Sequence, residues 1–380
     1  VDSIDRSYQD ELIHALASAA RDADVDLLCF AGGMLGAPED RASQRNRVYD
    51  LASPHNVDAL VASSGSLESR IGTEQLTTYL ERFEPLPLCS LGVGLPNVPS
   101  ITIDNTSGMR EAVQHLIEIH GRERIAFIGG PEANQEAAQR YRGYLDALED
   151  RRLRHDPELV VHGDFLQESG ARAVRLLLDE RQVTFDAVVA ASDEMAVGAM
   201  EELDGRGLHV PEAVSVVGFD DLVAGRYAAR PLTTVRQRIG QLATEAIRMA
   251  LRQIGSEQVP ALTQLETELV VRRSCGCTGK GGTPEVVAPA VSGGRQQVPT
   301  LAGRRAQILI ELMAAAPELS GAKWPDRLFD AFANEVRDQK TVAFTSVLDE
   351  LMEQAIASGQ EVGILQPVIS SLRRVVAPAL

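Results

Sequence analysis

Apolar and polar residues follow two different periods along residues 1–277. In some stretches apolar residues recur every three or four positions, as Leu12, Leu16 and Ala19 do, which predicts amphipathic helices. Between these stretches lie short continuous apolar runs, which predict buried strands. The predicted strands are 25–30, 59–62, 88–91, 101–104, 125–130, 187–190 and 214–219, and the clearest helices between them are 109–119, 139–148 and 168–178.

The alternation of strands and helices predicts an α/β fold. Parallel strands need helical crossovers, and those helices cover both faces of the sheet, which accounts for strands that are apolar throughout. The predicted strands are many for one sheet, and 101–104 falls midway between two similar blocks. We therefore predict two doubly wound parallel-sheet lobes rather than one.

The character of the sequence changes after Cys277. Residues 278–300 are rich in Gly, Pro and Val and lack a period, which predicts a linker. Residues 301–380 have few strand signals, and we expect a C-terminal all-α helical segment there that serves as a connector or dimerisation module. Because the last helix lacks a convincing terminator before Leu380, we expect the parent protein to continue. The amphipathic stretches are 301–315, 327–337, 341–357 and 364–376.

The net charge of the chain limits the kinds of molecule that it can bind. The 380 residues contain 37 Lys and Arg against 54 Asp and Glu, a formal net charge of -17. So acidic a surface repels phosphate backbones, and we expect no direct nucleic-acid contact by this chain. No apolar run approaches the roughly 20 residues of a membrane span, and the first residues lack the regions of a signal peptide. The four cysteines do not form a disulfide framework, so the expected location is the cytoplasm.

Polar residues gather where predicted strands end. Ser192 and Asp193 follow the strand 187–190, where one of them caps the next helix, and Asp220 and Asp221 follow the strand 214–219. In an open α/β sheet, ligands bind at the carboxyl ends of the strands. These carboxylates and this hydroxyl can accept hydrogen bonds from a polyhydroxylated ligand.

Several segments in order along residues 1–275 resemble the effector-binding core of the lactose-repressor (LacI/GalR) family. The resemblance implies the periplasmic-binding-protein type I fold, with one lobe at about 1–104 and 236–264 and the other at about 105–233 and 265–277. It also implies crossovers near Asp104, Thr233 and Leu265. The segments that carry it are 104–105, 128–131, 140–144, 163–165, 168–170, 191–200, 207–212, 215–221, 231–237 and 268–274.

The resemblance also assigns roles to individual residues. Arg140 matches an arginine that clamps polar groups of the effector, and Asp220 matches an aspartate that accepts from ligand hydroxyls or ring nitrogens. Phe165 matches an aromatic residue that stacks on the ligand. Ser192 stands where the family often has asparagine. The remaining candidates are Asp193, which either caps its helix or contacts the ligand, and Ser3 and Tyr8, which fall near the family's first strand–helix turn.

Other kinds of site find little support. Cys275 and Cys277 suggest either a metal site or a redox pair. However, no second ligand pair is evident, and Cys29 and Cys89 lie in strand-like runs. We therefore expect no metal. The nucleotide-binding glycine patterns are absent, which predicts no cofactor, and we find no catalytic constellation, so we expect no enzyme.

The expected function is a cytoplasmic ligand-sensing module. It would bind a small polar effector, a sugar or related metabolite, between two lobes and transmit their closure to a signalling or transcriptional output. We expect that no DNA-binding headpiece precedes Val1, and the Cys275–Cys277 ending resembles sensors that a helical connector joins to output domains. We expect a homodimer, with an output domain or partner beyond the C-terminus. The alternatives are a transporter's solute-binding protein, against which the helical segment counts, and a repressor fragment without its headpiece.

Overall fold

The computed structural model describes residues 1–4, 6–36, 44–277, 309, 324–338, 346–351 and 353. The chain divides into two compact units, Val1–Pro284 and Glu285–Leu380, and the first holds both sheets. The expected linker 278–300 lies outside the described residues.

The first sheet has four parallel strands. Its order is β1 (Leu60–Ser63), β2 (Leu88–Leu91), β3 (Ser100–Ile103) and β9 (Leu262–Leu265). Helices α1 (Ser7–Asp22) and α10 (Ile239–Ile254) pack against each other, and α10 also contacts β1, β2 and β3. In the part of the chain that the structure describes, this lobe also contains α3 (Ser64–Leu67) and α4 (Gly72–Leu80), with short 3-10 turns at Asn46–Leu51 and Glu81–Phe83.

The second sheet has six strands in the order β10-β8-β7-β6-β4-β5, all parallel except β10. Helices α5 and α6 form one closely packed pair, and α7 and α8 form another. Residues of β6 and β7 are buried on both faces, which shows that helices cover both sides of this sheet. The elements are β4 (Ile125–Gly129), β5 (Val160–His162), β6 (Ala187–Ala190), β7 (Ser215–Asp220), β8 (Thr233–Arg236), β10 (Glu268–Val270), α5 (Asn105–His120), α6 (Gln135–Asp150), α7 (Gln167–Arg175), continued by a π-helical turn Leu176–Glu180, α8 (Asp193–Gly205) and α9 (Val223–Arg226), with a 3-10 turn at Pro157–Leu159.

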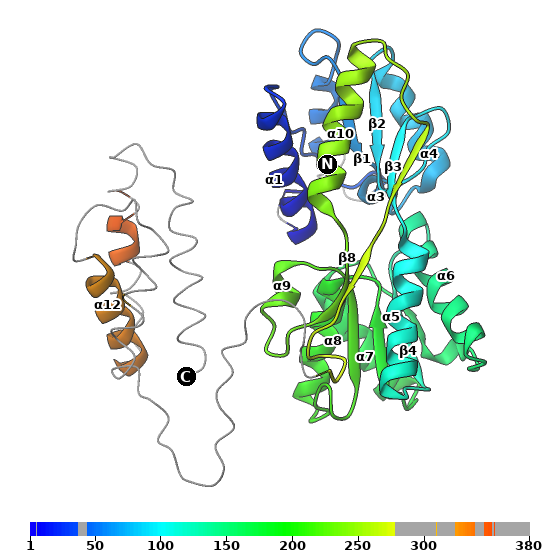
Figure 1. The fold of residues 1–380 in the computed structure, drawn as a ribbon, viewed down its shortest axis with the longest axis vertical. Helices are drawn as coiled ribbons and strands as arrows, with labels where there is room; N and C mark the ends of the chain where they lie inside the picture. The colour runs from blue at the N-terminus through cyan, green and yellow to red at the C-terminus, as the bar shows by residue number, and fades with distance from the viewer. Residues whose placement is uncertain are drawn as a thin grey trace. The chain divides into compact units, whose positions relative to one another are not determined.

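Three connections join the two lobes. They run from β3 to α5, from β8 to α10 and from β9 to β10. Two of them are hydrogen-bonded together, because Asp104 N donates to Leu265 O at 2.8 Å and Thr267 Oγ1 donates to Asp104 O at 3.2 Å. Figure 1 shows these segments passing between the lobes next to one another. Adjacent connections of this kind form a hinge.

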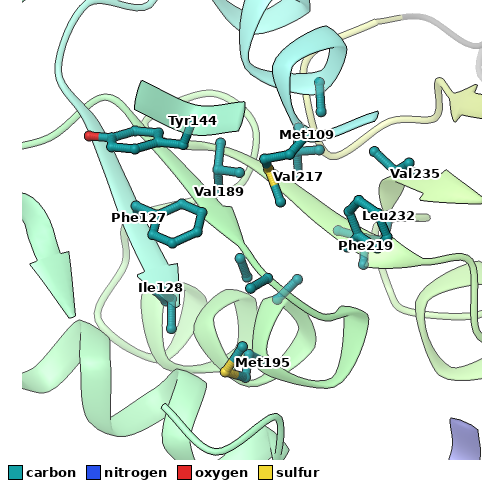
Figure 2. Close-up of a cluster of buried hydrophobic side chains, with 14 of the residues drawn as sticks. Met109, Phe127, Ile128, Tyr144, Val189, Met195, Val217, Phe219, Leu232 and Val235 are labelled. Carbon is teal, nitrogen blue, oxygen red and sulfur yellow. The ribbon is translucent and has the colours of Figure 1, made fainter. Parts of the chain in front are cut away.

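The larger core extends over both sheets, and Figure 2 shows a part of it at the second sheet. Phe127 of β4 stacks on Tyr144 of α6 with ring centroids 4.9 Å apart. The Tyr144 hydroxyl, fully inside this core, donates to Ile125 O at 3.0 Å, so its polar atom has a partner. A smaller cluster, which includes Leu76, Leu80 and Val93, lies in the first lobe.

The predicted strand at 25–30 is wrong. These residues have no strand conformation, and most of their side chains, including Leu27 and Leu28, are exposed. Of the residues that the structure describes, Val1 alone pairs beside them: its amino group donates to Phe30 O at 3.1 Å, and Gly32 N donates to Val1 O. A strand needs a ladder of such bonds along its length, which one residue does not supply.

Four strands, β5, β8, β9 and β10, lie outside the set predicted from apolar runs. β5 is short, and β9 has mostly exposed or half-buried side chains, so neither shows a continuous apolar run. β8 reads Thr-Thr-Val-Arg, where buried threonines take the place of aliphatic residues.

In the second unit, α12 (Trp324–Asp338) and residues 346–351 are helical, as expected for the C-terminal segment. Helix α12 buries Trp324, Leu328 and Phe329, and Arg327 forms an ion pair with Glu350. Among the described residues, no helix has both the length and the apolar character needed to cross a membrane.

The close packing of α7 on α8 yields a stability prediction. A Cβ at Gly170 would collide with the carbonyl oxygen of Met195, and a Cβ at Gly198 would collide with that of Gln167. Because both obstacles are backbone atoms, we expect Gly170→Ala to lower the free energy of unfolding by about 1–3 kcal/mol. The control is Gly205→Ala, where nothing lies within 4 Å, and which should stabilise α8 by about 0.5–1 kcal/mol. Urea unfolding of both variants measures the difference, and equal stabilities would contradict the packing described.

Candidate ligand-binding site

A cavity of about 370 Å³ lies between the two lobes. The second lobe contributes residues that follow β4, β6 and β7, namely Pro131, Ser192 and Asp220, because the carboxyl ends of these parallel strands meet at one edge. The first lobe contributes residues from α1 and from the segment after β1. The full lining is Arg6, Tyr8, Gln9, Met34, Gly65, Ser66, Ser69, Arg70, Pro131, Glu136, Arg140, Gly163, Asp164, Phe165, Leu166, Ser192, Glu194, Asp220, Leu222 and Gln237.

Arg140 is the most highly connected side chain of the cavity wall. Its side chain is 4% exposed, and its guanidinium lies over the Phe219 ring with 3.9 Å between Cζ and the ring centroid. Nε donates to Asn105 Oδ1 at 2.8 Å, and Nη1 donates to Ala191 O at 2.6 Å and to Asp220 Oδ1 at 3.4 Å. These bonds fix the plane of the guanidinium before any ligand arrives.

Asp220 connects the two lobes through hydrogen bonds. Besides the bond from Arg140, its Oδ1 accepts from Gln237 Nε2 at 2.6 Å. Gln237 follows β8 on the connection to α10, and its Oε1 accepts from the Tyr8 hydroxyl of the first lobe at 3.4 Å. A continuous chain of polar contacts therefore runs from α1 through the hinge to α6.

Burial dominates the electrostatics of these groups. It raises the pKa of Asp220 to about 7, although Arg140 and Gln237 act in the opposite direction. It also raises the pKa of Glu136, whose carboxylate lies 3.7 Å from Arg140 Nη2. Burial raises the pKa of Tyr8 as well, so that this phenol is a neutral donor.

Two residues of the wall hold strained backbone conformations. Phe165 has φ +66° and Asp220 has φ +119°, in the region that side chains with a Cβ rarely adopt. Such strain is retained where the surrounding structure demands it and is commonest at functional sites. The next residue, Asp221, also has a positive φ, and it accepts bonds from Arg226, Arg236 and Arg272, which hold the end of β7 in place.

The lobes also meet at the rim of the cavity. Asn134 Nδ2 donates to Gly65 O at 2.6 Å and lies 3.3 Å from Ser69 Oγ, and Gln135 N donates to Glu68 Oε1 at 2.6 Å. Burial raises the pKa of Glu68 to about 7. These contacts, between the turn before α6 and the segment after β1, hold the lobes against each other in this conformation.

Five of the seven candidates from the sequence line the cavity: Arg140, Asp220, Phe165, Ser192 and Tyr8. Ser192 also caps α8, accepting from Met195 N at 3.3 Å. Asp193 does not line it. Its carboxylate is fully buried and accepts hydrogen bonds from Thr234 Oγ1 at 2.5 Å and from Leu222 N at 2.7 Å. It therefore joins β8 to the segment before α9.

Ser3 does not line the cavity either, because α1 begins only at Ser7 and the side chains that reach the wall are those of Arg6, Tyr8 and Gln9. Sequence reasoning missed Glu136 and Gln237. Glu136 lies four residues before Arg140 and so shares its helix face, a signal that was present. Gln237 directly follows β8, a strand outside the predicted set. The other residues missed are Arg6, Gln9, Met34, Gly65, Ser66, Ser69, Arg70, Pro131, Gly163, Asp164, Leu166, Glu194 and Leu222.

Among the described residues of the cavity wall there is no histidine or cysteine, so the wall offers no soft metal ligands. Such ligands gather elsewhere, at the opposite end of α5 from Asn105, where His115, His120, Cys275 and Cys277 lie together.

Comparison with known proteins agrees with this architecture. Residues 113–275 match the periplasmic binding protein-like domain (Peripla_BP_3). The chain is 42% identical over 185 residues to the transcriptional regulator CelR of Thermobifida fusca, a match that covers 48% of this chain and 54% of that protein. It is 32% identical over 275 residues to the repressor PurR of Haemophilus influenzae, covering 70% of this chain and 77% of PurR. The chain thus spans about half the length of CelR and about three quarters of PurR.

Solved structures give the same result. A complex of the regulator CelR with cellobiose superposes with a TM-score of 0.63 at 32% identity, covering 72% of this chain and 82% of that one. A LacI family regulator from Mycobacterium smegmatis superposes with a TM-score of 0.62 at 26% identity, covering 72% and 96%. These relatives are transcriptional regulators and not enzymes, in agreement with the expectation that the chain is not an enzyme. The chain belongs to the LacI family, through a periplasmic-binding-protein-like effector-binding domain built on the two sheets.

Proposed function

We propose that the two-lobed domain senses a small sugar for a cytoplasmic transcriptional regulator. The observation that carries the proposal is the polar chain from Tyr8 through Gln237 and Asp220 to Arg140, which crosses between lobes along the wall of one cavity. A ligand that bonds to this chain contacts both lobes at once. It therefore stabilises one angle between them over others.

The composition of the wall favours a polyhydroxylated ligand. The wall contains both carboxylates and guanidiniums, so it offers acceptors and donors to the hydroxyls of a ligand. Phe165 adds a flat apolar surface of the kind on which sugar rings stack. The volume of about 370 Å³ lies near the lower end of the range for small-molecule sites, which suits one or two sugar rings. The likeness to CelR, solved with cellobiose, supports the same class.

The proposed mechanism is a shift in lobe closure. Contacts at the hinge and at the rim each join the lobes, so the free energy difference between closed and open forms is a small sum of bonds made and lost. A ligand needs to prefer one form by only about 1–3 kcal/mol to move a poised equilibrium. We propose that the change reaches an output through the helical segment 301–380, acting as connector or dimerisation module in a homodimer. The expectation that this chain makes no nucleic-acid contact of its own stays a prediction.

A transporter's solute-binding protein is the alternative reading of the same fold. The regulators among the relatives favour a transcriptional output over transport.

The ligand class and the site are tested together by calorimetric titration. We expect a sugar from a panel of mono- and disaccharides that includes cellobiose to bind, and purine nucleosides, as the comparison class, not to bind. Asp220→Asn and Arg140→Met should each weaken the binding of that sugar by about 2–5 kcal/mol, because each leaves a buried charged partner unpaired. The matched control is Arg142→Met, two residues along α6, where the side chain is 68% exposed. Unchanged affinity in both cavity variants, while their thermal unfolding shows them folded, would show that the site lies elsewhere.

The raised pKa of Asp220, about 7, predicts a pH dependence of ligand affinity. A sugar hydroxyl donates to the ionised carboxylate, so protonation of Asp220 competes with binding. Affinity should fall by up to about tenfold for each pH unit below 7 and level off above about pH 8. Because the folded-state pKa is raised, the free protein should also lose stability as pH rises through 7. Titrations across this range measure the first effect, and Asp220→Asn should give a flat profile; tighter wild-type binding at low pH argues against this role.

A further inference from the structure

Four soft ligand atoms meet where α5 ends and where the chain runs on from β10. His115 and His120 lie on the last turns of α5, and Cys275 and Cys277 lie on the turn after β10. Their ligand atoms all lie within 4.8 Å of one another. Cys277 Sγ is 3.6 Å from His115 Nε2 and 3.4 Å from His120 Nε2.

These distances match those of a tetrahedral metal site. Metal–sulfur bonds of about 2.3 Å and metal–nitrogen bonds of about 2.0–2.1 Å place sulfur and nitrogen ligands roughly 3.5–3.6 Å apart. The two measured sulfur–nitrogen distances fall within about 0.2 Å of that value.

The backbone around the cysteines is built to turn both thiols the same way. Gly276, between them, has φ +110°, a conformation that suits glycine, and a Cβ there would lie 3.1 Å from His120 Nδ1. Gly276 N donates to Arg273 O at 3.0 Å, which closes the turn. Ser215 Oγ donates to Cys275 O at 2.7 Å and so ties the turn to the start of β7.

The donor chemistry of the groups fits the same site. A neutral imidazole offers the electron pair of one ring nitrogen, and metal binding displaces the thiol protons of the cysteines, as in other thiolate sites.

We propose that His115, His120, Cys275 and Cys277 bind one zinc ion in a closed structural site. Two thiolates and two imidazoles in a tetrahedron are the donor set that favours zinc, and four protein ligands leave no open position for catalysis. The half-buried side chains of His115, His120 and Cys277 give the ion a path of entry, while Cys275 is buried.

The place of the cluster gives the ion a structural task. Helix α5 has 16 residues, about 24 Å, and starts at Asn105, which accepts a bond from Arg140 in the ligand-binding cavity. The ion would fasten the other end of the same helix to the segment that leads out of the effector-binding domain. The proposal does not depend on which ligand the cavity takes.

One part of the evidence for this zinc site was already visible in the sequence. His115 and His120 are separated by four residues, which falls within the histidine spacing of zinc sites, but the cysteines are about 155 residues away in the chain. The expectation of no metal rested on the absence of a second ligand pair, and the fold supplies that pair.

The first test is the metal content of the full chain, purified without a histidine tag and without chelator. Elemental mass spectrometry should find about one zinc per chain, and Cys275→Ser/Cys277→Ser should reduce this at least tenfold. The matched controls are Cys29→Ser and His209→Ala, whose side chains are exposed and lie outside the cluster, and both should keep the ion. Equal zinc in the double variant and the controls would overturn the proposal.

The second test needs no variant, so it stands even if the double variant fails to fold. Wild-type protein stripped with chelator and reloaded with cobalt should show the intense visible bands of tetrahedral cobalt and the charge-transfer absorption of thiolate ligands. Zinc should abolish both, and the stripped protein should unfold at a lower temperature than the reloaded one. A cobalt spectrum without thiolate absorption, or a Cys275–Cys277 disulfide in the protein as isolated, refutes the site.

Discussion

The buried contact between Arg140 and Asp220 is the interaction on which the candidate site depends. Both side chains are almost entirely removed from water, which costs several kcal/mol for each charge before any attraction is counted. The structure offsets that cost with Asn105, Ala191 O and Gln237 as further partners and with the face of Phe219 beneath the guanidinium. Those partners come from α5, from the end of β6, from the hinge and from β7. The pair therefore fixes where four separate elements stand relative to one another, and it leaves a carboxylate whose charge is finely balanced near neutral pH.

That balance explains how a small ligand can act on the whole domain. Gln237 lies on the connection between the lobes and bonds to Asp220 on one side and to Tyr8 on the other. A ligand hydroxyl that takes over part of the Asp220 carboxylate changes a bond made by a hinge residue, with no intervening chain of side chains. The rim contacts of Asn134 and Gln135 give the opposite edge of the cavity a separate set of bonds. Each of these two sets of polar contacts contributes a few kcal/mol or less. One ligand can therefore shift the equilibrium between the open and closed forms.

The apolar pattern of the sequence predicted those strands whose formation depends mainly on that pattern. The runs at 88–91 and 187–190 became β2 and β6 with the same bounds, since strands buried on both faces must be apolar throughout. The run at 25–30 looked similar and failed, because a strand also needs a neighbour, which a single sequence does not display. The site shows the same limit. Asp193 and Asp220 both follow strand ends, but Asp193 turns inward to Thr234 while Asp220 faces the cavity, and only the packing of β8 decides between these directions. The histidine–cysteine cluster depended entirely on distant contacts.

Helix α5 shows how the fold turns a local change into a larger motion. Its partner α6 lies so close that a Cβ at Gly143 would collide with the carbonyl oxygen of Thr106, so the two helices move as one body. That body carries Arg140 and Glu136 on α6 and Asn105 on α5. A Cβ at Gly108 would collide with Thr267 of one connection and with Val235 in β8. Under the proposed function, a displacement of the α5–α6 pair would act on the connection that contains Thr267 and on β8, the strand that leads into another connection. Close backbone packing transmits a displacement because no flexible side chain lies between the two elements to adjust to it. Three glycines, at 108, 143 and 276, allow such close packing along α5 from the cavity to the end of the helix.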